Sequence, residues 1–330
     1  MNRSDNLIPS ASHRIVLTGA SGTLGRNFLE LIGHRPDFKV LALHRPKTRL
    51  RSSWPSVTAF PIENLERSTL GMELSHFQPT CVVHCAATGM EFPRTQWFDL
   101  IRFNVDVSIN FCEFAAANPG CHFIYISTGL AYREQGRPLK EDDALDTLHP
   151  YGASKAAADM LVRAAAVEFG VPLTVLRPFS FTGLGDDRTR LFATLLRATA
   201  EKKEVVLSEG TQIRDHCSAR DIAAAILAAA QIPPLSGGSS RIYNLGSGSL
   251  IPLRVLIEKL ILELGLSTRL HFGGRPFGRF EPRHLVADTT KAREELGWRP
   301  RHNLAHAVWQ LARESFPELD IRPPREDFQG

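Results

Sequence analysis

Tyr151 and Lys155, in the segment Tyr151-Gly-Ala-Ser-Lys155, are the residue pair in this sequence best suited to acid–base chemistry. Residues four apart share one face of a helix, so both side chains are expected on the same side of an Ala-rich helical stretch. A nearby ammonium stabilises a phenolate and lowers the pKa of the phenol. The pair therefore predicts a tyrosine that exchanges a proton with a sugar or alcohol oxygen, with an ordinary surface Tyr and Lys as the alternative.

Two hydroxyl residues end a predicted strand nearby. The run Phe123-Ile-Tyr-Ile precedes Ser127 and Thr128. In an open α/β sheet the ligand lies beyond the carboxyl ends of the strands. We therefore expect both hydroxyls in the crevice that holds a ligand, with a turn or helix cap as the alternative role.

The glycine pattern Gly19-Ala-Ser-Gly22-Thr-Leu-Gly25 follows the apolar run Ile15-Val-Leu and precedes a helical segment. Glycines let the backbone approach a pyrophosphate, and the helix N-terminus offers unpaired N–H groups with a partial positive charge. The spacing differs from the Gly-x-Gly-x-x-Gly of many dehydrogenases. The pattern predicts dinucleotide binding, and its alternative is an ordinary strand–turn–helix.

Composition limits the class of protein. The chain has 330 residues, 43% of them hydrophobic, and a formal net charge of +4. Such a chain can bury a large core, and its small charge gives no reason to expect nucleic-acid binding. Five cysteines form no disulfide framework, which favours reduced thiols and a cytoplasmic location. Cys81, His84 and Cys85 belong to one apolar run without a second ligand pair, so we expect core packing and no metal.

Strands and helices alternate along the first 180 residues, which predicts a Rossmann-type doubly wound parallel sheet. No apolar stretch approaches the roughly 20 residues that cross a bilayer, so no membrane partner is expected. The predicted strands are 14–18, 39–43, 56–61, 81–85, 122–127, 173–176 and 242–245, and the predicted helices are 97–118, 153–169, 191–202, 218–231 and 253–264.

The expected domains are a disordered tail (1–12), an NAD(P)-binding domain (13–182) and a smaller, discontinuous substrate-binding region (183–330). Segments near 211–246 are expected to return to the first domain.

The chain resembles the extended short-chain dehydrogenase/reductases, specifically the nucleotide-sugar epimerase/dehydratase group, over about residues 13–300. The resemblance rests on the shared order of modest motifs. They are the glycine pattern, Val83-His-Cys-Ala-Ala87, Asn104-Val-Asp, Tyr125-Ile-Ser-Thr128, Tyr151-Gly-Ala-Ser-Lys155, Leu176-Arg-Pro178, Arg214-Asp215, Asp221, Tyr243-Asn-Leu-Gly246 and Asp288–Trp298.

The resemblance implies a role for each matching residue. Tyr151 is the general acid/base, Lys155 tunes it and binds the nicotinamide ribose, and Thr128 bonds the reacting oxygen. The implied cofactor-binding residues also include Gly19, Ser21, Gly22, Thr23, Leu24, Gly25, His44, Arg45, Asn64, Leu65, Cys85, Ala86, Ala87, Asn104 and Pro178. The implied substrate-binding residues are Thr88, Ser127, Ser180, Arg214, Arg279 and Glu281, of which Arg214 meets the diphosphate of a nucleotide sugar.

Three departures from the family pattern narrow the reaction. His44 and Arg45 stand where a ribose-binding carboxylate is expected, which favours NADP(H), with NAD(H) as the alternative. Gly129 and Leu130 replace the Asp-Glu pair of the 4,6-dehydratases, which disfavours a dehydratase. Ser180 stands where many members have an asparagine that contacts the diphosphate, so this position does not identify the substrate.

These features predict an NADPH-dependent reductase of a nucleotide-diphosphate keto-sugar, such as a 4-keto-6-deoxyhexose. The alternatives are a nucleotide-sugar 4-epimerase with the same residues and a non-catalytic NADP(H) sensor. The expected partners are the sugar nucleotide and a second copy of the chain in a homodimer.

Overall fold

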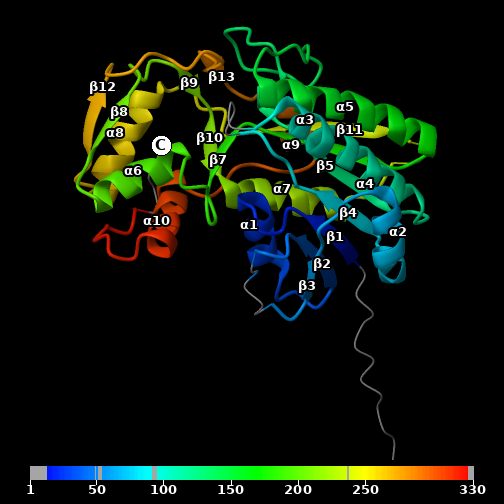
Figure 1. Ribbon diagram of the computed structural model, residues 1–330. Coiled ribbons are helices and arrows are strands. Elements are labelled where there is room, and N and C mark those ends of the chain that lie inside the picture. The colour runs from blue at the N-terminus through cyan, green and yellow to red at the C-terminus, as the bar shows by residue number, and fades with distance from the viewer. Residues whose placement is uncertain (1–12, 49, 51–53, 91–94, 236–237, 326–330) are drawn as a thin grey trace, which may run out of the picture.

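The computed structural model describes residues 13–48, 50, 54–90, 95–235 and 238–325, and its centre is a seven-stranded parallel sheet (Figure 1). The predicted tail, residues 1–12, lies outside the described residues. The strand order is β11-β6-β5-β4-β1-β2-β3, so the winding direction reverses between β1 and β4. The strands are β1 (His13–Thr18), β2 (Phe38–His44), β3 (Val57–Pro61), β4 (Cys81–His84), β5 (His122–Ile126), β6 (Leu173–Pro178) and β11 (Ser240–Leu245).

Helices cover both faces of this sheet, which is why its strands read as continuous apolar runs. In β1, Ile15 and Leu17 point to one core and Val16 points to the other. The first core is closed by α1 (Thr23–Ile32), α7 (Ala219–Gln231) and α9 (Thr290–Glu295), and the second by α2 (Arg67–Leu74), α4 (Val107–Ala116) and α5 (Pro150–Phe169). The predicted doubly wound fold is confirmed.

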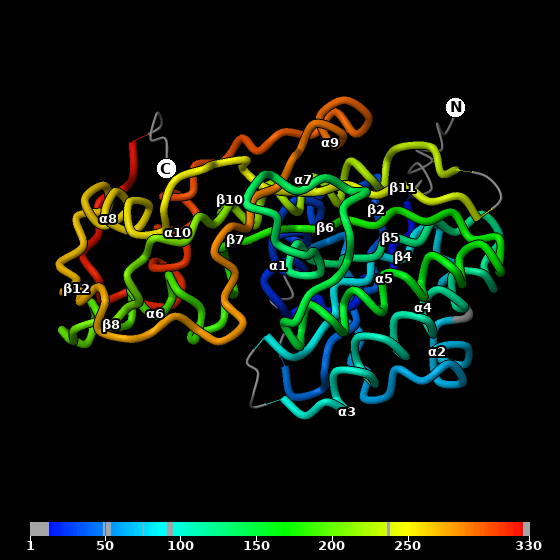
Figure 2. Tube along the Cα trace, turned by 90° about the horizontal axis from the view of Figure 1, so that it is seen from above, coloured from blue at the N-terminus to red at the C-terminus, as the bar shows by residue number. Residues whose placement is uncertain are grey.

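A third core lies beside the sheet and is built from the C-terminal half (Figure 2). It joins α6 (Leu191–Ala200), α8 (Leu253–Leu264) and α10 (Leu304–Ser315) to the strand pair β8 (Glu204–Leu207) and β12 (Arg269–Phe272). Short parallel pairs connect the two parts: β7 (Ser180–Thr182) with β10 (His216–Ser218), and β9 (Ile213–Arg214) with β13 (His284–Leu285).

The helix predicted over 97–118 is confirmed over 97–116, with one irregularity. It runs without a break through α3 (Trp97–Leu100), a π-helical turn η2 (Ile101–Asp106) and α4. The wide turn surrounds Asn104, whose carbonyl accepts the Ser108 hydroxyl at 2.7 Å.

The short strand pairs and the helices α2, α9 and α10 were not predicted. Two further short turns are η1 (Ser75–Phe77) and η3 (Gly129–Ala131). Within the described parts of the chain, no helix is long and apolar enough to cross a bilayer.

Candidate active site

The crevice at the reversal between β1 and β4 is where an open α/β sheet binds its ligand. Two of its glycines are needed by the fold itself. Gly19 has φ +66°, and a Cβ there would stand 2.7 Å from the Ala86 amide nitrogen. A Cβ at Gly25 would stand 2.6 Å from the Cα of Ala20. Gly22 is different, because a Cβ there would meet only the Gly19 carbonyl oxygen at 3.3 Å. Gly22 therefore leaves open space in front of the loop.

The amino end of α1 fits the pyrophosphate of a dinucleotide. Gly22 occupies the N-cap position, and no side chain of the described residues caps this helix. Its first N–H groups are thus available to an anion. Of the predicted contact residues here, Leu24 packs into the core, and Thr23 donates its hydroxyl to Asp186 Oδ1 at 3.0 Å. Leu24 and Thr23 can therefore offer only their backbone N–H groups to a ligand. The side chain of Ser21, by contrast, is partly exposed and can itself reach a ligand.

The ends of β2 and β3 lie at the same edge of the sheet. Arg45 directly follows β2, is exposed, and pairs with no carboxylate among the described residues. The ring of His44 contacts the Arg45 carbonyl at 3.0 Å through Nδ1. Beyond β3, Asn64 accepts the Glu66 amide, and the carbonyl of Leu65 accepts the side chain of Asn110. A free guanidinium at this edge is suited to a ribose 2′-phosphate.

Beyond β4, the segment Cys85–Thr88 faces the glycine loop. The Ala86 amide donates to Thr18 Oγ1 at 3.1 Å. Asn104 is fully buried, and its amide group binds both the N–H and the C=O of Thr88 at 2.9 Å. The Asn104 amide therefore holds the loop that lies against the glycine turn, and the role of Asn104 in cofactor binding stays a prediction. Burial raises the pKa of the Cys85 thiol to about 12, so it is no thiolate nucleophile.

Tyr151 lies in the first turn of α5, which begins three residues before the predicted start at 153. Pro150 occupies the start of the helix, where its missing N–H costs nothing, and the His149 ring caps the Gly152 amide at 3.3 Å. The predicted lowering of the Tyr151 pKa by Lys155 is wrong in this structure. Burial raises the pKa of Tyr151 to about 12, and the charge that opposes this is Arg190. The phenol therefore holds its proton through neutral pH.

Lys155 is 1% exposed and lies against another aromatic ring. Its ammonium stands 4.2 Å from the centre of the Tyr125 ring. Burial lowers the pKa of Lys155 to about 7, while the charge of Asp159 acts in the opposite direction. The ammonium of Lys155 thus lies over the Tyr125 ring and interacts with Asp159, and it is not among the groups that set the pKa of Tyr151.

The two hydroxyl residues after β5 have different surroundings. The Oγ1 of Thr128 accepts the Leu130 amide at 3.2 Å and so caps η3, yet its proton stays available. Ser127 is buried, and its Oγ has no hydrogen-bond partner among the described residues. A buried hydroxyl without a partner at the carboxyl end of a strand is a group that a ligand can satisfy.

Basic side chains gather near Tyr151. Burial lowers the pKa of His149 and of His216, and charge repulsion from Arg214 lowers both further. The charge of Arg190 acts on both Tyr151 and His216. The Nε of Arg214 and both ring nitrogens of His216 are buried without a partner among the described residues. Ser180 pairs with His216 in the register of β7 and β10, which places it in the same wall. Arg190, His149 and His216 were not predicted, although His149 stands two residues before Tyr151.

Arg279 and Glu281 lie in the loop between β12 and β13 and line a cavity of about 380 Å³ with His149. The Glu281 carboxylate accepts Gln212 Nε2 at 2.7 Å and the Gly278 amide at 3.1 Å, so it is held by the protein. The Arg279 guanidinium lies 5.2 Å from the Phe280 ring. The charge of Glu281 also acts on Arg214, which links this loop to the basic wall.

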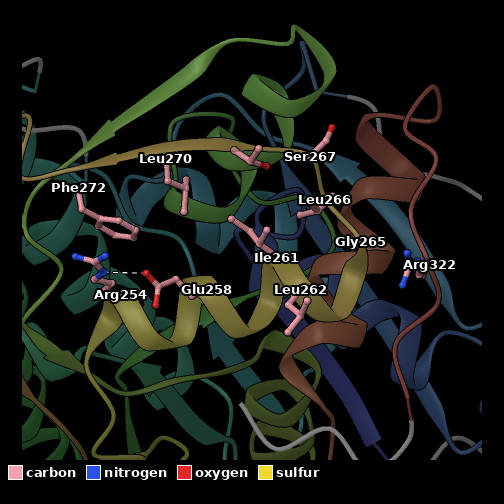
Figure 3. A pocket seen from close by; sticks show the side chains of 11 residues that line it. Arg254, Glu258, Ile261, Leu262, Gly265, Leu266, Ser267, Leu270, Phe272 and Arg322 are labelled. Atoms are coloured by element: carbon pink, nitrogen blue, oxygen red, sulfur yellow. Dashed lines mark hydrogen bonds and ion pairs between the residues drawn. The ribbon is translucent and has the colours of Figure 1, made fainter.

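A second cavity of about 570 Å³ lies between α8 and β12 (Figure 3). Leu262 and Leu270 line it together with Arg254, which is paired with Glu258 at 2.8 Å. None of the predicted site residues lines this cavity.

Cys81 and His84 are buried in β4, and the described residues contain no group of three His, Cys, Asp or Glu side chains placed to hold a metal ion. Both ring nitrogens of His84 contact hydroxyl groups, those of Thr18 and Ser108. The side chains of this segment thus serve packing and hydrogen bonding.

The model of the NAD dependent epimerase/dehydratase family matches residues 15–246. The chain belongs to this family. It is 29% identical to the UDP-glucose 4-epimerase of Corynebacterium glutamicum over 242 residues, 67% of this chain and 71% of that protein. It is 29% identical to the dTDP-6-deoxy-L-talose 4-dehydrogenase (NAD(P)(+)) of Kitasatospora kifunensis over 320 residues, 92% and 95% of the two chains.

The fold matches solved structures of nucleotide-sugar enzymes. The structure of MoeE5 in complex with UDP-glucuronic acid and NAD has a TM-score of 0.79 and 24% identity, and the match covers 93% of this chain and 100% of that one. The resemblance to the extended short-chain dehydrogenase/reductases is thus confirmed. As a member of the epimerase/dehydratase family, the protein is an oxidoreductase or epimerase of that type.

Proposed function

We propose that the protein is an NADPH-dependent reductase of a nucleotide-diphosphate keto-sugar, with a 4-keto-6-deoxyhexose as the favoured class. The observation that carries the proposal is the buried Tyr151, whose phenol keeps its proton, on a turn of α5 that packs closely against η3, the turn that Thr128 caps: a Cβ on Gly152 would clash with the Leu130 carbonyl oxygen. The relative that matches 92% of the chain acts as a sugar 4-dehydrogenase, the same reaction type in the opposite direction.

The residues divide the reduction among themselves. When bound, NADPH would supply the hydride that the carbonyl carbon of the sugar requires. Tyr151 donates its phenolic proton to the carbonyl oxygen, so the ketone becomes a secondary alcohol and the phenolate is reprotonated from solvent. Thr128 donates a hydrogen bond to the same oxygen. Arg214 and Arg279 balance the charge of the diphosphate.

A dehydratase is disfavoured by packing as well as by residue type. Gly129 stands where the 4,6-dehydratases carry an acid, and a Cβ there would lie 2.7 Å from the Phe179 ring. Because Phe179 is buried, the ring has little room to yield. An acidic side chain at position 129 would thus clash before it could reach a substrate.

A 4-epimerase with the same residues is the second candidate, supported by the relative from Corynebacterium glutamicum. Reduction consumes NADPH in every turnover, whereas epimerisation returns the cofactor to its starting state. The deciding experiment is NADPH oxidation with a panel of nucleotide-linked keto-sugars. Stoichiometric oxidation supports the reductase, and interconversion of nucleotide sugars with no net oxidation supports the epimerase. Cofactor binding without any turnover would favour the third alternative, a non-catalytic NADP(H) sensor.

Arg45 is expected to select NADP(H). A charge-assisted bond to the 2′-phosphate contributes about 1.5–3 kcal/mol, so Arg45→Ala should weaken NADP⁺ binding about tenfold or more and spare NAD⁺. Calorimetric titration of both oxidised cofactors measures this. Lys47→Ala, two residues along the same exposed turn, is the matched control and should change neither affinity. Equal affinities of the wild type for the two cofactors would refute the preference.

Arg214 is expected to bind the substrate diphosphate. Arg214→Ala should raise KM for the nucleotide sugar about tenfold or more and leave NADPH affinity unchanged, because a buried charged donor is lost only on the substrate side. Steady-state kinetics and NADPH titration measure the two effects. Arg254→Ala, which removes an arginine of the α8 cavity, is the control. An unchanged KM would show that Arg214 has a structural role and does not bind the substrate.

The homodimer stays part of the proposal. Several apolar side chains are about half exposed or more: Trp97, Phe98 and Ile101 on α3 and η2, and Met160 and Leu161 on α5. An apolar surface of this kind is covered when two copies associate. The molar mass from light scattering decides between a monomer and a dimer.

A further inference from the structure

His84 is a buried histidine that the proposed chemistry leaves unused. Its side chain is fully buried at the end of β4, next to the crevice. The ring centre lies 5.1 Å from that of Phe111 and 6.1 Å from that of Tyr125, which it stacks against. Nδ1 lies 2.8 Å from Thr18 Oγ1, and Nε2 lies 3.1 Å from Ser108 Oγ.

The proton on Nε2 follows from the bonds of Ser108. The Ser108 hydroxyl donates its only proton to the Asn104 carbonyl at 2.7 Å. Its oxygen must therefore accept at the contact with His84. The ring nitrogen that faces Ser108 is thus the one that carries hydrogen, Nε2–H.

The hydrogen bonds of Thr18 show that Nδ1, the other ring nitrogen, carries no proton. Thr18 Oγ1 accepts the Ala86 amide at 3.1 Å, so its own proton is free to donate. The contact at Nδ1 is the one place among the described residues where that proton finds an acceptor. A neutral ring with hydrogen on Nε2 satisfies both ring nitrogens and the hydroxyls of Thr18 and Ser108, whereas a protonated ring would leave the Thr18 proton without an acceptor.

The charges around the ring act in the same direction. Burial lowers the pKa of His84 well below its usual value, and the positive charge of Lys155 on α5 lowers it further. The rings packed against it, Phe111 on α4 and Phe123 and Tyr125 on β5, carry no charge at neutral pH. The imidazole is thus built to stay neutral.

The hydrogen bonds continue from Ser108 through Asn104 to α5, the helix that carries Tyr151. Asn104 donates to Ser154 Oγ at 2.8 Å, and Ser154 donates to the Tyr151 carbonyl at 2.8 Å. On the other side, Thr18 and Ala86 border the glycine loop, where a Cβ on Gly19 would reach the Ala86 amide. His84 therefore lies between the loop that receives the cofactor and the turn that carries the proton donor.

We propose that His84 is a positioning residue: as a neutral Nε2–H imidazole it holds the loop after β4 to the π-helical turn η2, and through it aligns the cofactor site with Tyr151. This inference rests on the proposed function only for the role of Tyr151. The tautomer and the bonding pattern are properties of the protein itself and are testable without substrate.

The first test is NMR of the protein labelled with ¹⁵N in histidine, with His84 assigned by comparison with His84→Asn. The proposal expects a protonated Nε2 and an unprotonated Nδ1 whose signals do not move between about pH 6 and 9. A proton on Nδ1, or a titration within this range, would overturn it. Neither outcome depends on turnover, so failure here is distinct from failure of the reductase proposal.

The second test separates the two bonds. An Asn side chain reaches the Nδ1 position and keeps an acceptor for Thr18, while a Gln side chain reaches the Nε2 position and keeps a donor for Ser108. His84→Asn should speed amide exchange in 104–108 about tenfold and lower kcat, with NADPH affinity nearly kept. His84→Gln should speed exchange at 86–88 and weaken NADPH about tenfold, with exchange in 104–108 nearly kept.

His122→Asn is the matched control, because His122 is a buried histidine of the neighbouring strand whose Nε2 contacts Thr174 Oγ1 at 2.9 Å. It should alter none of these local readouts. If the Asn and Gln variants change both segments equally, or change neither, His84 only fills space and the proposal is wrong. If one of the two variants fails to fold, the other supplies the assignment of the His84 signals, and the NMR result on the wild type still decides the tautomer.

Discussion

Replacing Tyr151 with Phe is expected to lower kcat by about 10²–10⁴-fold, the usual contribution of a positioned general acid. The change removes the phenolic oxygen and keeps the buried ring, so KM for the sugar and the affinity for NADPH should stay close to wild type. Because burial holds the pKa of Tyr151 at about 12, the proton is present at every neutral pH and reduction needs no deprotonated phenol. Stopped-flow measurement of NADPH oxidation follows the chemical step directly.

Three companion variants place this result in context. Thr128→Val should slow turnover less, since it removes one hydrogen bond and not the proton. Lys155→Ala should damage both rate and cofactor affinity. Tyr243→Phe is the control, because the Tyr243 hydroxyl contacts Glu295 at 3.2 Å, away from the crevice. Near-wild-type turnover of Tyr151→Phe on an authentic substrate would remove Tyr151 from the mechanism.

Gly22→Val should abolish binding of NADPH in a protein that still folds. The backbone at Gly22 has φ −79° and ψ 172°, an extended conformation that valine adopts without strain. The added Cβ meets only one carbonyl oxygen at 3.3 Å, so the loop itself has room. The side chain would instead fill the space in front of the α1 N-terminus, where the pyrophosphate is expected. NADPH fluorescence titration and the melting temperature measure the two effects.

Gly71→Val is a useful control, since Gly71 has nothing within 4 Å of its added Cβ and should keep cofactor binding. Gly25→Val should behave in the opposite way and prevent folding, because its Cβ would stand 2.6 Å from Ala20. Normal NADPH binding by Gly22→Val would reduce the glycine pattern to a structural turn.

The elements of the sheet were predictable because strands buried on both faces must be apolar throughout. Strands such as 39–43 and 173–176 were identified within one or two residues of their observed ends. The helix over 97–118 was identified equally well, but hydrophobic spacing does not register the extra residue that widens one turn around Asn104. The short strands β7, β9, β10 and β13 were missed because two or three residues carry no periodicity.

For the candidate site, local sequence determined the glycine turn, the proximity of Tyr151 to Lys155 on one helix, and the hydroxyls that end β5. Their roles in catalysis stay predictions. Local sequence also placed Arg45 at the end of β2, where the acid of other members is missing. These features are short-range, so chain spacing alone specifies them.

Only the tertiary structure decided the electrostatics. Lys155 was expected to lower the pKa of Tyr151, yet the fold places the Lys155 ammonium over the ring of Tyr125. The fold also buries the phenol of Tyr151, and desolvation raises its pKa by more than the charge of Arg190 lowers it. Arg190 and His216 join the basic wall from segments far apart in the chain, and His84 receives its tautomer from Thr18 and Ser108, 66 and 24 residues away. Charges and buried hydrogen bonds depend on distance in space, which residue spacing along the chain does not encode.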